Sequence, residues 1–322
     1  MRLLALLSFA AAVFTAVAPA TAQDKFPSRP IQTIITTPAG SQGDVLIRAL
    51  AIEASKTLGQ PIIVLNRPNT TGTIGAELAK RAPPDGYTMF VGGNTTMAAN
   101  VHLVKNLQYD PIKDFGAVTQ LTGNPLVLVV KPALPVKTVQ EFIAYAKSRP
   151  GQLNYGVGNS GSKAAVGLLQ SLTGISTAEI PFPGMPPAVQ ELIAGRLDFL
   201  FSDPLVVDAH IKAGTLRALA VTASIKSPSM SSLPTMVEAG VPGYRDIVTF
   251  LGLWVPHGTP TPAISALNDA FVKAINSPEG QEQFRRMGLV PRPSTPEQLT
   301  TLNKEQIAFW EHLVKVSGLQ PQ

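Results

Sequence analysis

The chain has 322 residues, 45% of them hydrophobic, and a formal net charge of +5. This weak positive charge comes without a dense run of Lys and Arg, so no nucleic-acid partner is expected. The absence of cysteine excludes disulfides, thiol catalysis and a lipid-modified N-terminal cysteine, and a hydrophobic core therefore has to hold the fold together.

The first residues have the pattern of a secretory signal. Arg2 supplies the positive start, residues 3–17 form an apolar stretch, and Ala20-Thr21-Ala22 has the small-x-small pattern of a cleavage site. We therefore expect a signal peptide over residues 1–22 and a mature chain that begins near Gln23. A transmembrane anchor is the alternative, but the stretch is near the short limit for spanning a bilayer.

Strands and helices alternate through most of the remaining chain. Apolar and β-branched runs predict strands over residues 31–36, 62–65, 87–91, 126–130, 153–157, 197–201 and 216–222. Periodicity and capping residues predict helices over 44–58, 74–80, 138–148, 163–172, 189–194 and 295–316. Residues 126–130 are apolar throughout, which is typical of a strand in a buried parallel sheet. The pattern predicts an α/β fold with parallel sheets.

Two glycine-bearing loops precede predicted helices. Residues 37–44 read Thr-Pro-Ala-Gly-Ser-Gln-Gly-Asp, and residues 156–162 read Gly-Val-Gly-Asn-Ser-Gly-Ser. Such a loop presents unpaired backbone N–H groups at the positive end of the helix dipole, where a carboxylate binds without a cationic side chain. Two of these loops, far apart in the sequence, predict a clamp around a small acid. An ordinary turn with Asp44 as helix cap is the alternative for the first loop.

The same loops allow other functions. Gly156, Gly158 and Gly161 match a dinucleotide fingerprint, and Glu179 lies about where a ribose-binding acid stands. Each loop also falls one residue short of the G-x-S-x-G elbow of serine hydrolases. However, residues 153–155 make a poor core strand, and the four scattered His offer neither a favoured base nor metal-ligand spacing. We expect no metal and no cofactor.

Ordered motifs run along the whole expected mature chain. They are Phe-Pro-Ser-Arg-Pro-Ile at 26–31, Pro-Ala-Gly at 38–40, Asn-Arg-Pro at 66–68, Ile-Gly-Ala-Glu at 74–77, Ala-Pro-Pro-Asp-Gly-Tyr-Thr at 82–88, Tyr-Asp-Pro-Ile-Lys-Asp-Phe at 109–115, His-Ile-Lys-Ala-Gly-Thr-Leu-Arg-Ala-Leu-Ala-Val-Thr at 210–222, Glu-Ala-Gly-Val-Pro-Gly-Tyr at 238–244 and Gly-Thr-Pro at 258–260. Any one motif is weak, but their order and spacing are specific. Together they resemble the Bug-type receptors, the periplasmic substrate-binding proteins of tripartite tricarboxylate transporters.

The resemblance implies a two-lobed periplasmic-binding-protein fold, similar to type II, with the ligand cleft between the lobes. Two strands would cross between the lobes near Gly123 and Val248. Lobe one would hold residues 24–123 and 248–322, and lobe two residues 124–247. The implied function is a periplasmic receptor, a monomer and not an enzyme, that captures a small organic acid for the membrane components of a tripartite transporter. A periplasmic hydrolase acting on a small carboxylate is the alternative.

The expected ligand-binding residues combine the two loops with positions that the resemblance places at the cleft. In the family, the loop matching residues 38–44 binds a ligand carboxylate, partly through ordered water. Phe182 matches a usually aromatic position, although it could simply pack a turn, and Asp203 ends a buried strand where it could accept a ligand N–H. The expected set is Ala39, Gly40, Ser41, Gln42, Gly43, Asp44, Thr95, Thr96, Asn159, Ser160, Ser162, Phe182 and Asp203.

Overall fold

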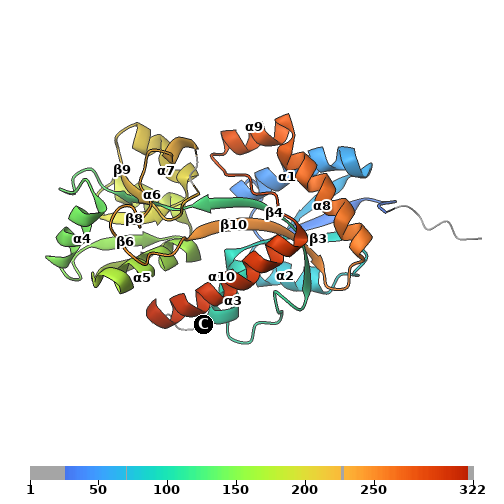
Figure 1. Ribbon diagram of the computed structural model, residues 1–322, viewed down its shortest axis with the longest axis horizontal. Coiled ribbons are helices and arrows are strands. Elements are labelled where there is room, and N and C mark those ends of the chain that lie inside the picture. The colour runs from blue at the N-terminus through green and yellow to red at the C-terminus, as the bar shows by residue number, and fades with distance from the viewer. Residues whose placement is uncertain (1–25, 70, 226–227, 318–322) are drawn as a thin grey trace, which may run out of the picture.

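The computed structural model describes residues 26–69, 71–225 and 228–317. These residues form two five-stranded sheets flanked by helices, and the sheets lie in two lobes side by side (Figure 1). The expected signal peptide, residues 1–22, and the expected mature start at Gln23 lie outside the described residues. Within the described part, no helix is long and apolar enough to cross a membrane.

The sheet of the first lobe has the strand order β2-β1-β3-β10-β4, in which the first three strands are parallel and β10 runs antiparallel to its neighbours. Helices α1, α8 and α9 share a hydrophobic core on one face, and α2 packs on the other. The strands are β1 (Ile31–Ile35), β2 (Ile62–Asn66), β3 (Thr88–Gly93), β4 (Phe115–Pro125) and β10 (Val248–Pro256). The helices are α1 (Gln42–Leu58), α2 (Thr73–Lys80), the π-helix η1 (Thr95–Ala99), α3 (Asn100–Leu103), α8 (Thr261–Asn276) and α9 (Pro278–Arg286).

The sheet of the second lobe has the order β7-β6-β8-β5-β9. Helices α4 and α5 share a core with one face, and α6 and α7 with the other. The strands are β5 (Val127–Val130), β6 (Asn154–Val157), β7 (Ala178–Pro181), β8 (Phe199–Ser202) and β9 (Arg217–Val221). The helices are α4 (Val139–Lys147), α5 (Ser160–Thr173), α6 (Met185–Ile193), α7 (Pro204–Lys212) and the short 3₁₀ turn η2 (Pro228–Met230).

The apolar run at 126–130 does form a strand, but its expected parallel setting is wrong. Strand β5 runs antiparallel to both of its neighbours, β8 and β9. All of its residues are buried because helices cover both faces of the sheet. A strand buried on two faces needs apolar residues whichever way its neighbours run, so its composition does not reveal their direction.

Strands β4 and β10 connect the two lobes. They pair antiparallel from Phe115 opposite Pro256 to Pro125 opposite Val248, and β5 of the second sheet begins two residues later (Figure 1). All strands of the first sheet fall within residues 31–125 and 248–256, and all strands of the second within 127–221. On this basis we propose lobe boundaries near Gly123 and Val248.

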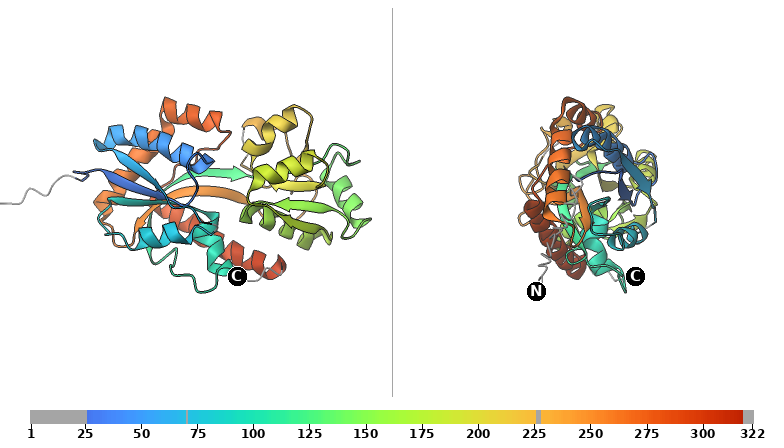
Figure 2. Two further views of the ribbon diagram at one scale, coloured as in Figure 1. Left: turned by 180° about the vertical axis from the view of Figure 1, so that it is seen from behind. Right: turned by 90° about the vertical axis from the view of Figure 1, so that its right-hand side faces the viewer.

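The last helix, α10 (Pro296–Ser317), packs against both lobes. Near its start, Leu299 is buried beside Phe250 and Trp254 of β10. Further along, Phe309, Trp310 and Leu313 join the core formed by α4, α5 and their sheet. The views from opposite sides agree that α10 runs beneath the junction of the lobes (Figures 1 and 2). It therefore forms a non-covalent third link beside the two crossing strands.

Candidate functional site

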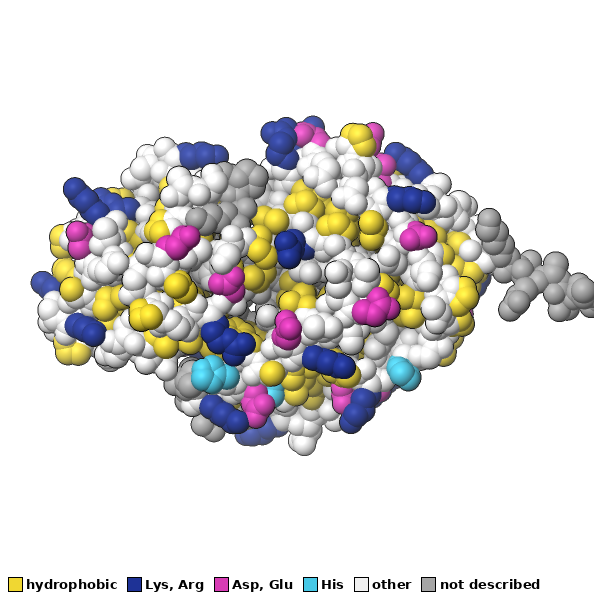
Figure 3. All heavy atoms as spheres, in the orientation of Figure 1, with side chains coloured by type: hydrophobic (Ala, Val, Ile, Leu, Met, Phe, Trp, Pro, Cys, Tyr) yellow, Lys and Arg dark blue, Asp and Glu magenta, His cyan; other side chains and the backbone are white. Residues whose placement is uncertain are grey.

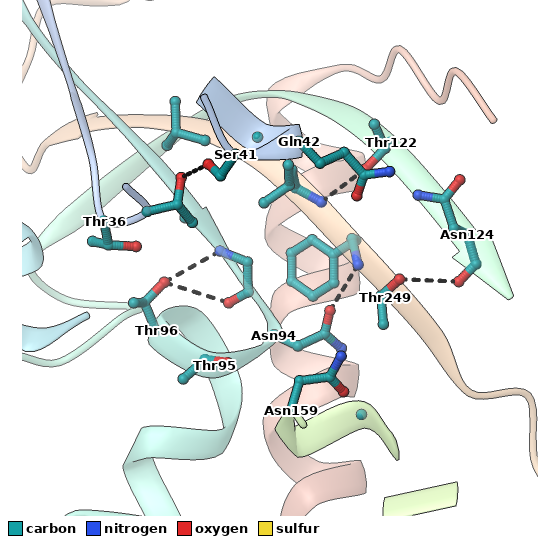
Figure 4. Close-up of a pocket in the computed structure, with 18 of the residues that line it drawn as sticks. Thr36, Ser41, Gln42, Asn94, Thr95, Thr96, Thr122, Asn124, Asn159 and Thr249 are labelled. Atoms are coloured by element: carbon teal, nitrogen blue, oxygen red, sulfur yellow. Dashed lines mark hydrogen bonds between the residues drawn. The ribbon is translucent and has the colours of Figure 1, made fainter. Parts of the chain in front are cut away.

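A cavity of about 330 Å³ lies where the two lobes meet the crossing strands (Figure 4). It is bordered by the carboxyl ends of β1 and β3, the starts of α1 and α5, and the adjoining parts of β4 and β10. Most of its lining residues carry a hydroxyl, amide or carboxyl group, but apolar atoms make up the larger part of the exposed lining. The lining residues are Ile35, Thr36, Thr37, Ser41, Gln42, Gly43, Val91, Gly92, Gly93, Asn94, Thr95, Thr96, Thr122, Asn124, Asn159, Ser160, Gly161, Asp203, Thr249, Phe250, Leu251 and Leu289.

The first glycine-bearing loop brings the start of α1 to the cavity. The helix begins at Gln42 rather than at Asp44, because Ser41 is the N-cap and its Oγ accepts a hydrogen bond from the Asp44 N–H at 3.4 Å. Ser41 Oγ also donates to Thr37 Oγ1 at 2.8 Å (Figure 4). The N–H groups of Gln42 and Gly43 have no acceptor in the described residues. They are the unpaired first-turn donors that an anion requires.

Asp44 supports this loop from behind and does not line the cavity. Its carboxylate accepts hydrogen bonds from the Gly40 N–H at 2.9 Å, Asn66 Nδ2 at 2.8 Å and Arg48 Nε at 3.0 Å. The Arg48 bond is the main reason why the pKa of Asp44 is lowered to about 2. The Gly40 N–H is therefore already used, and Gly40 itself, with φ 79°, shapes the turn rather than the cavity wall.

The second glycine-bearing loop places the start of α5 across the cavity. The helix begins at Ser160, earlier than expected, because Asn159 caps it. Asn159 Oδ1 accepts from the Ser162 N–H at 2.8 Å, and Ser162 Oγ donates back to the Asn159 carbonyl at 2.8 Å. Ser162 is thus occupied by the cap and lies outside the lining. Ser160 and Gly161 line the cavity, and their N–H groups have no acceptor among the described residues.

The π-helix η1 supplies hydroxyl groups and contacts the opposite lobe. Thr96 Oγ1 accepts from the Gly93 N–H at 3.2 Å, and Thr95 Oγ1 lies 3.2 Å from Ser160 Oγ of the second lobe. Just before η1, the Asn94 amide accepts from the Phe250 N–H at 2.7 Å and donates to the Val248 carbonyl at 3.0 Å (Figure 4). Asn94 therefore fixes η1 to the crossing strand β10. Single π turns of this kind are often found at functional sites.

Asp203 is the one ionisable residue in the lining of this cavity. Its oxygens lie 3.1 Å from Thr249 Oγ1 and 3.4 Å from Asn159 Nδ2, and both of these groups are uncharged. Burial raises the pKa of the Asp203 carboxyl above its ordinary value, while these hydrogen bonds partly oppose the rise. Because the lining contains no Lys, Arg or His, no cationic side chain of the cavity offsets this carboxylate.

The structure brings eight of the thirteen expected site residues together around one cavity. They are Ser41, Gln42, Gly43, Thr95, Thr96, Asn159, Ser160 and Asp203. The other five, Ala39, Gly40, Asp44, Ser162 and Phe182, do not line it. Phe182 packs against the α6–α7 core, where its ring would lie 3.5 Å from a Cβ added at Gly156. Trp254 of β10 is buried in the core with Leu299 and does not line the cavity.

Several lining residues were not in the expected set. Thr36 and Thr37 adjoin the first loop, whereas Thr122, Asn124 and Thr249 lie on the crossing strands. Gly123 and Val248 were the expected crossing positions. Their polar neighbours Thr122, Asn124 and Thr249 could therefore have been predicted as lining residues. The cavity lining therefore includes residues that precede or follow the expected positions in the sequence.

The alternatives weighed from the sequence find little support in the geometry. A Cβ at Gly158 would collide with the backbone of Gly184 and Met185, so this glycine permits two loops to pack. Glu179 accepts from the Tyr155 hydroxyl at 3.0 Å and pairs with Lys163 at 2.8 Å, away from the cavity lining. The cavity lining holds no His to serve as a base. The described residues contain no cluster of three or more His, Asp or Glu that could hold a metal ion.

Comparison with known proteins decides the family. A family model described as "Tripartite tricarboxylate transporter family receptor" matches residues 46–319. The chain belongs to this receptor family. It is 33% identical to BugT of Bordetella pertussis over 98% of both chains. It is also 34% identical to a Cupriavidus necator protein encoded in the gbd 5′ region, over 96% of this chain and 94% of the relative.

Solved structures support the same family and fold. An R. palustris protein solved with adipate is 31% identical and superposes with a TM-score of 0.81, over 92% of this chain and 100% of that one. MatC from Rhodopseudomonas palustris, solved with bound malate, is 33% identical with a TM-score of 0.76, over 90% and 100%. The expected Bug-type resemblance and the two-lobed α/β binding-protein fold are confirmed. The receptors of this family bind solutes in the periplasm.

Proposed function

We propose that this receptor binds a small organic acid in the cavity between its lobes and releases it chemically unchanged. The observation that carries the proposal is the convergence of two helix starts on one cavity. Gln42 and Gly43 of α1 and Ser160 and Gly161 of α5 supply unpaired N–H donors from opposite lobes. Partial positive charge at both helix starts favours an anion, and hydroxyl groups and water complete its hydrogen bonds.

The lining favours binding over catalysis. The hydroxyls of Ser41 and Ser160 have neither a His nor a second ionisable group in the cavity that could activate them. The relatives solved with adipate and malate support a carboxylate as the ligand of this receptor too. A hydrolase is therefore the weaker proposal.

The cellular setting is part of the proposal. We infer that the signal peptide over residues 1–22 is cleaved and that the mature monomer delivers its ligand to the membrane components of a tripartite transporter. We expect no nucleic-acid partner, and on the face drawn in Figure 3 positive and negative side chains are mixed.

Native mass spectrometry of the exported, purified receptor tests the proposal. We expect an adduct with the mass of a small organic acid, which gentle unfolding releases intact. The released acid, added back to stripped protein, should rebind and remain unchanged after prolonged incubation. Conversion of the acid would favour the hydrolase. If neither a co-purified acid nor a panel of mono-, di- and tricarboxylates binds, the proposal is wrong.

A further inference from the structure

We propose that Asp203 makes this receptor selective for acids that carry one carboxylate together with a neutral or cationic hydrogen-bond donor. A second carboxylate in place of that donor would be disfavoured. This inference rests on the proposed function, because it specifies which organic acid the cavity accepts.

The charges that face the cavity differ between its parts. Around the starts of α1 and α5, four backbone N–H groups offer partial positive charge and suit a single carboxylate. Asp203 adds the one full charge of the lining, and that charge is negative. A dicarboxylate would place its second charge in a cavity where no side chain is cationic and one is anionic. Like charges repel more strongly in a cavity between protein lobes than in bulk water, because the effective dielectric constant is lower there.

The position of Asp203 in its helix shows that its carboxylate is directed to the cavity. Asp203 is the N-cap residue of α7, with φ −61° and ψ 139°, yet its side chain makes no capping hydrogen bond. An Asp at this position would ordinarily stabilise the helix through such a bond. Its oxygens instead face Thr249 on crossing strand β10 and Asn159 at the start of α5.

The neighbours of Asp203 leave it able to accept from a ligand. Thr249, Asn159 and the backbone N–H of Asp203 can each give one hydrogen bond, whereas a carboxylate has about four acceptor positions. Asn159 cannot rotate to offer its carbonyl oxygen, because that oxygen caps α5 by accepting from Ser162. An amide, hydroxyl or ammonium group of the ligand would meet free lone pairs, and an uncompensated buried carboxylate gains most from such a donor.

Calorimetry with matched acids tests the inference. The probes are succinate, glutarate and adipate, each paired with its semi-amide, which has the same length and keeps one carboxylate. We expect at least one semi-amide to bind wild-type receptor roughly tenfold or more tightly than its dicarboxylate. In Asp203→Asn, that preference should shrink by a similar factor, mainly through tighter dicarboxylate binding.

A matched control variant distinguishes an effect at the cavity from an effect on helix α7. Asp208→Asn removes an acid from the same helix, where Asp208 pairs with Lys212 at 2.6 Å outside the cavity lining, and should keep the wild-type preference. The Asp203→Asn protein should fold, because the new amide can donate to Thr249 Oγ1 while that hydroxyl donates to the Asn124 carbonyl at 3.3 Å. Thermal melting tests whether the variant folds. If it does not fold, the comparison of each dicarboxylate with its semi-amide on wild-type receptor still tests the inference.

Each outcome bears on the inference. Dicarboxylates that bind wild-type receptor as tightly as their semi-amides would overturn it and leave the proposed function intact. A preference that survives in Asp203→Asn would also overturn it, because Asp203 would not be its cause. If no member of any pair binds, the result counts against organic-acid binding itself, and against this inference with it.

Discussion

At the scale of single residues, Gly43 is the position at which the role of the first loop is tested. It lies in the first turn of α1 and lines the cavity. A Cβ there would meet the ends of two flexible side chains, Ile35 Cδ1 at 3.3 Å and Leu251 Cδ1 at 3.6 Å. The protein could adjust to a larger side chain, but the space beside the N–H groups would be lost.

We therefore expect Gly43→Val to weaken binding of the co-purified acid by roughly a hundredfold, while the cost in folding stability stays near 1 kcal/mol. Calorimetry and thermal melting measure the two effects. Thr57→Val, an equally small change at an exposed position of the same helix, should alter neither. Normal affinity in a folded Gly43→Val protein would exclude this loop from the site.

Asp44 makes a pH-dependent contribution to stability. Its folded-state pKa, about 2, lies below the ordinary value of 3.8, chiefly because of the Arg48 hydrogen bond. Its stabilisation is thus fully present above the unfolded-state pKa and is lost as the pH falls from about 4 through 2. Asp44→Asn should flatten the acid limb of the stability–pH curve.

Urea unfolding between pH 2 and pH 7 measures that curve. Asp269→Asn is the control, because Asp269 is an exposed carboxylate on α8 without an ion pair in the described residues. It should leave the curve unchanged. If wild type and Asp44→Asn lose stability in parallel below pH 4, the proposed support of the loop by an ionised Asp44 is wrong.

At the scale of elements, the sequence predicted local structure better than it predicted neighbours. The capping box of Thr138 and Glu141 opens α4 as expected, and Gly59, with φ 69°, ends α1. Such signals act within a few residues of chain. The direction of strands beside β5 depends on residues some 70 to 90 positions away, which leave no mark on an apolar run.

The residues of the candidate site likewise include some that local sequence patterns predict and others that depend on distant parts of the chain. Both helix starts were expected in the correct loops, because glycines mark these loops locally, but the caps Ser41 and Asn159 lie earlier than the expected starts at 44 and 163. Thr249 and Asn124 reach the cavity only because two strands cross between lobes, and no short pattern encodes that. Asp44 was expected among the ligand-binding residues, but it lies outside the cavity lining, where its carboxylate accepts from Asn66 of β2, a partner that reaches it only after folding.

The sequence predicted the position of helix α10 correctly but did not indicate that this helix packs against both lobes. Trp310 is buried in the second-lobe core, and its Nε1 has no hydrogen-bond partner in the described residues. Trp310→Ala should lower stability by about 3–5 kcal/mol through the cavity that it leaves. Trp310→Phe should cost much less, because it keeps an aromatic ring and removes the unpaired N–H.

Chemical denaturation measures both variants at Trp310. Leu302→Ala, a change at a partly buried residue of α10 that packs on the first lobe, serves as a comparison. Equal losses for Trp310→Ala and Trp310→Phe would mean that the indole N–H carries a stabilising interaction. A negligible loss for Trp310→Ala would mean that α10 does not hold the two lobes together.

At the scale of the whole molecule, the ligand should bring the lobes together. The α1 donors belong to the first lobe and the α5 donors to the second, so a ligand touching both binds the closed form better. The contact between Thr95 and Ser160 at 3.2 Å lies between the same lobes. Because α10 packs on both lobes, its packing must adjust during closure.

Small-angle X-ray scattering can follow this movement. We expect the radius of gyration to fall when the co-purified acid saturates the stripped wild-type protein. The Gly43→Val protein should show no fall at the same acid concentration. An unchanged radius in saturated wild-type protein would contradict closure by the ligand.

The central claim is that an organic acid is held as an anion by the helix starts of both lobes. Its most direct test is a calorimetric titration of stripped wild-type receptor with the co-purified acid and with the same molecule after every carboxyl has become an amide. The account predicts that the acid binds roughly tenfold or more tightly than the neutral amide. Equal affinities would contradict it.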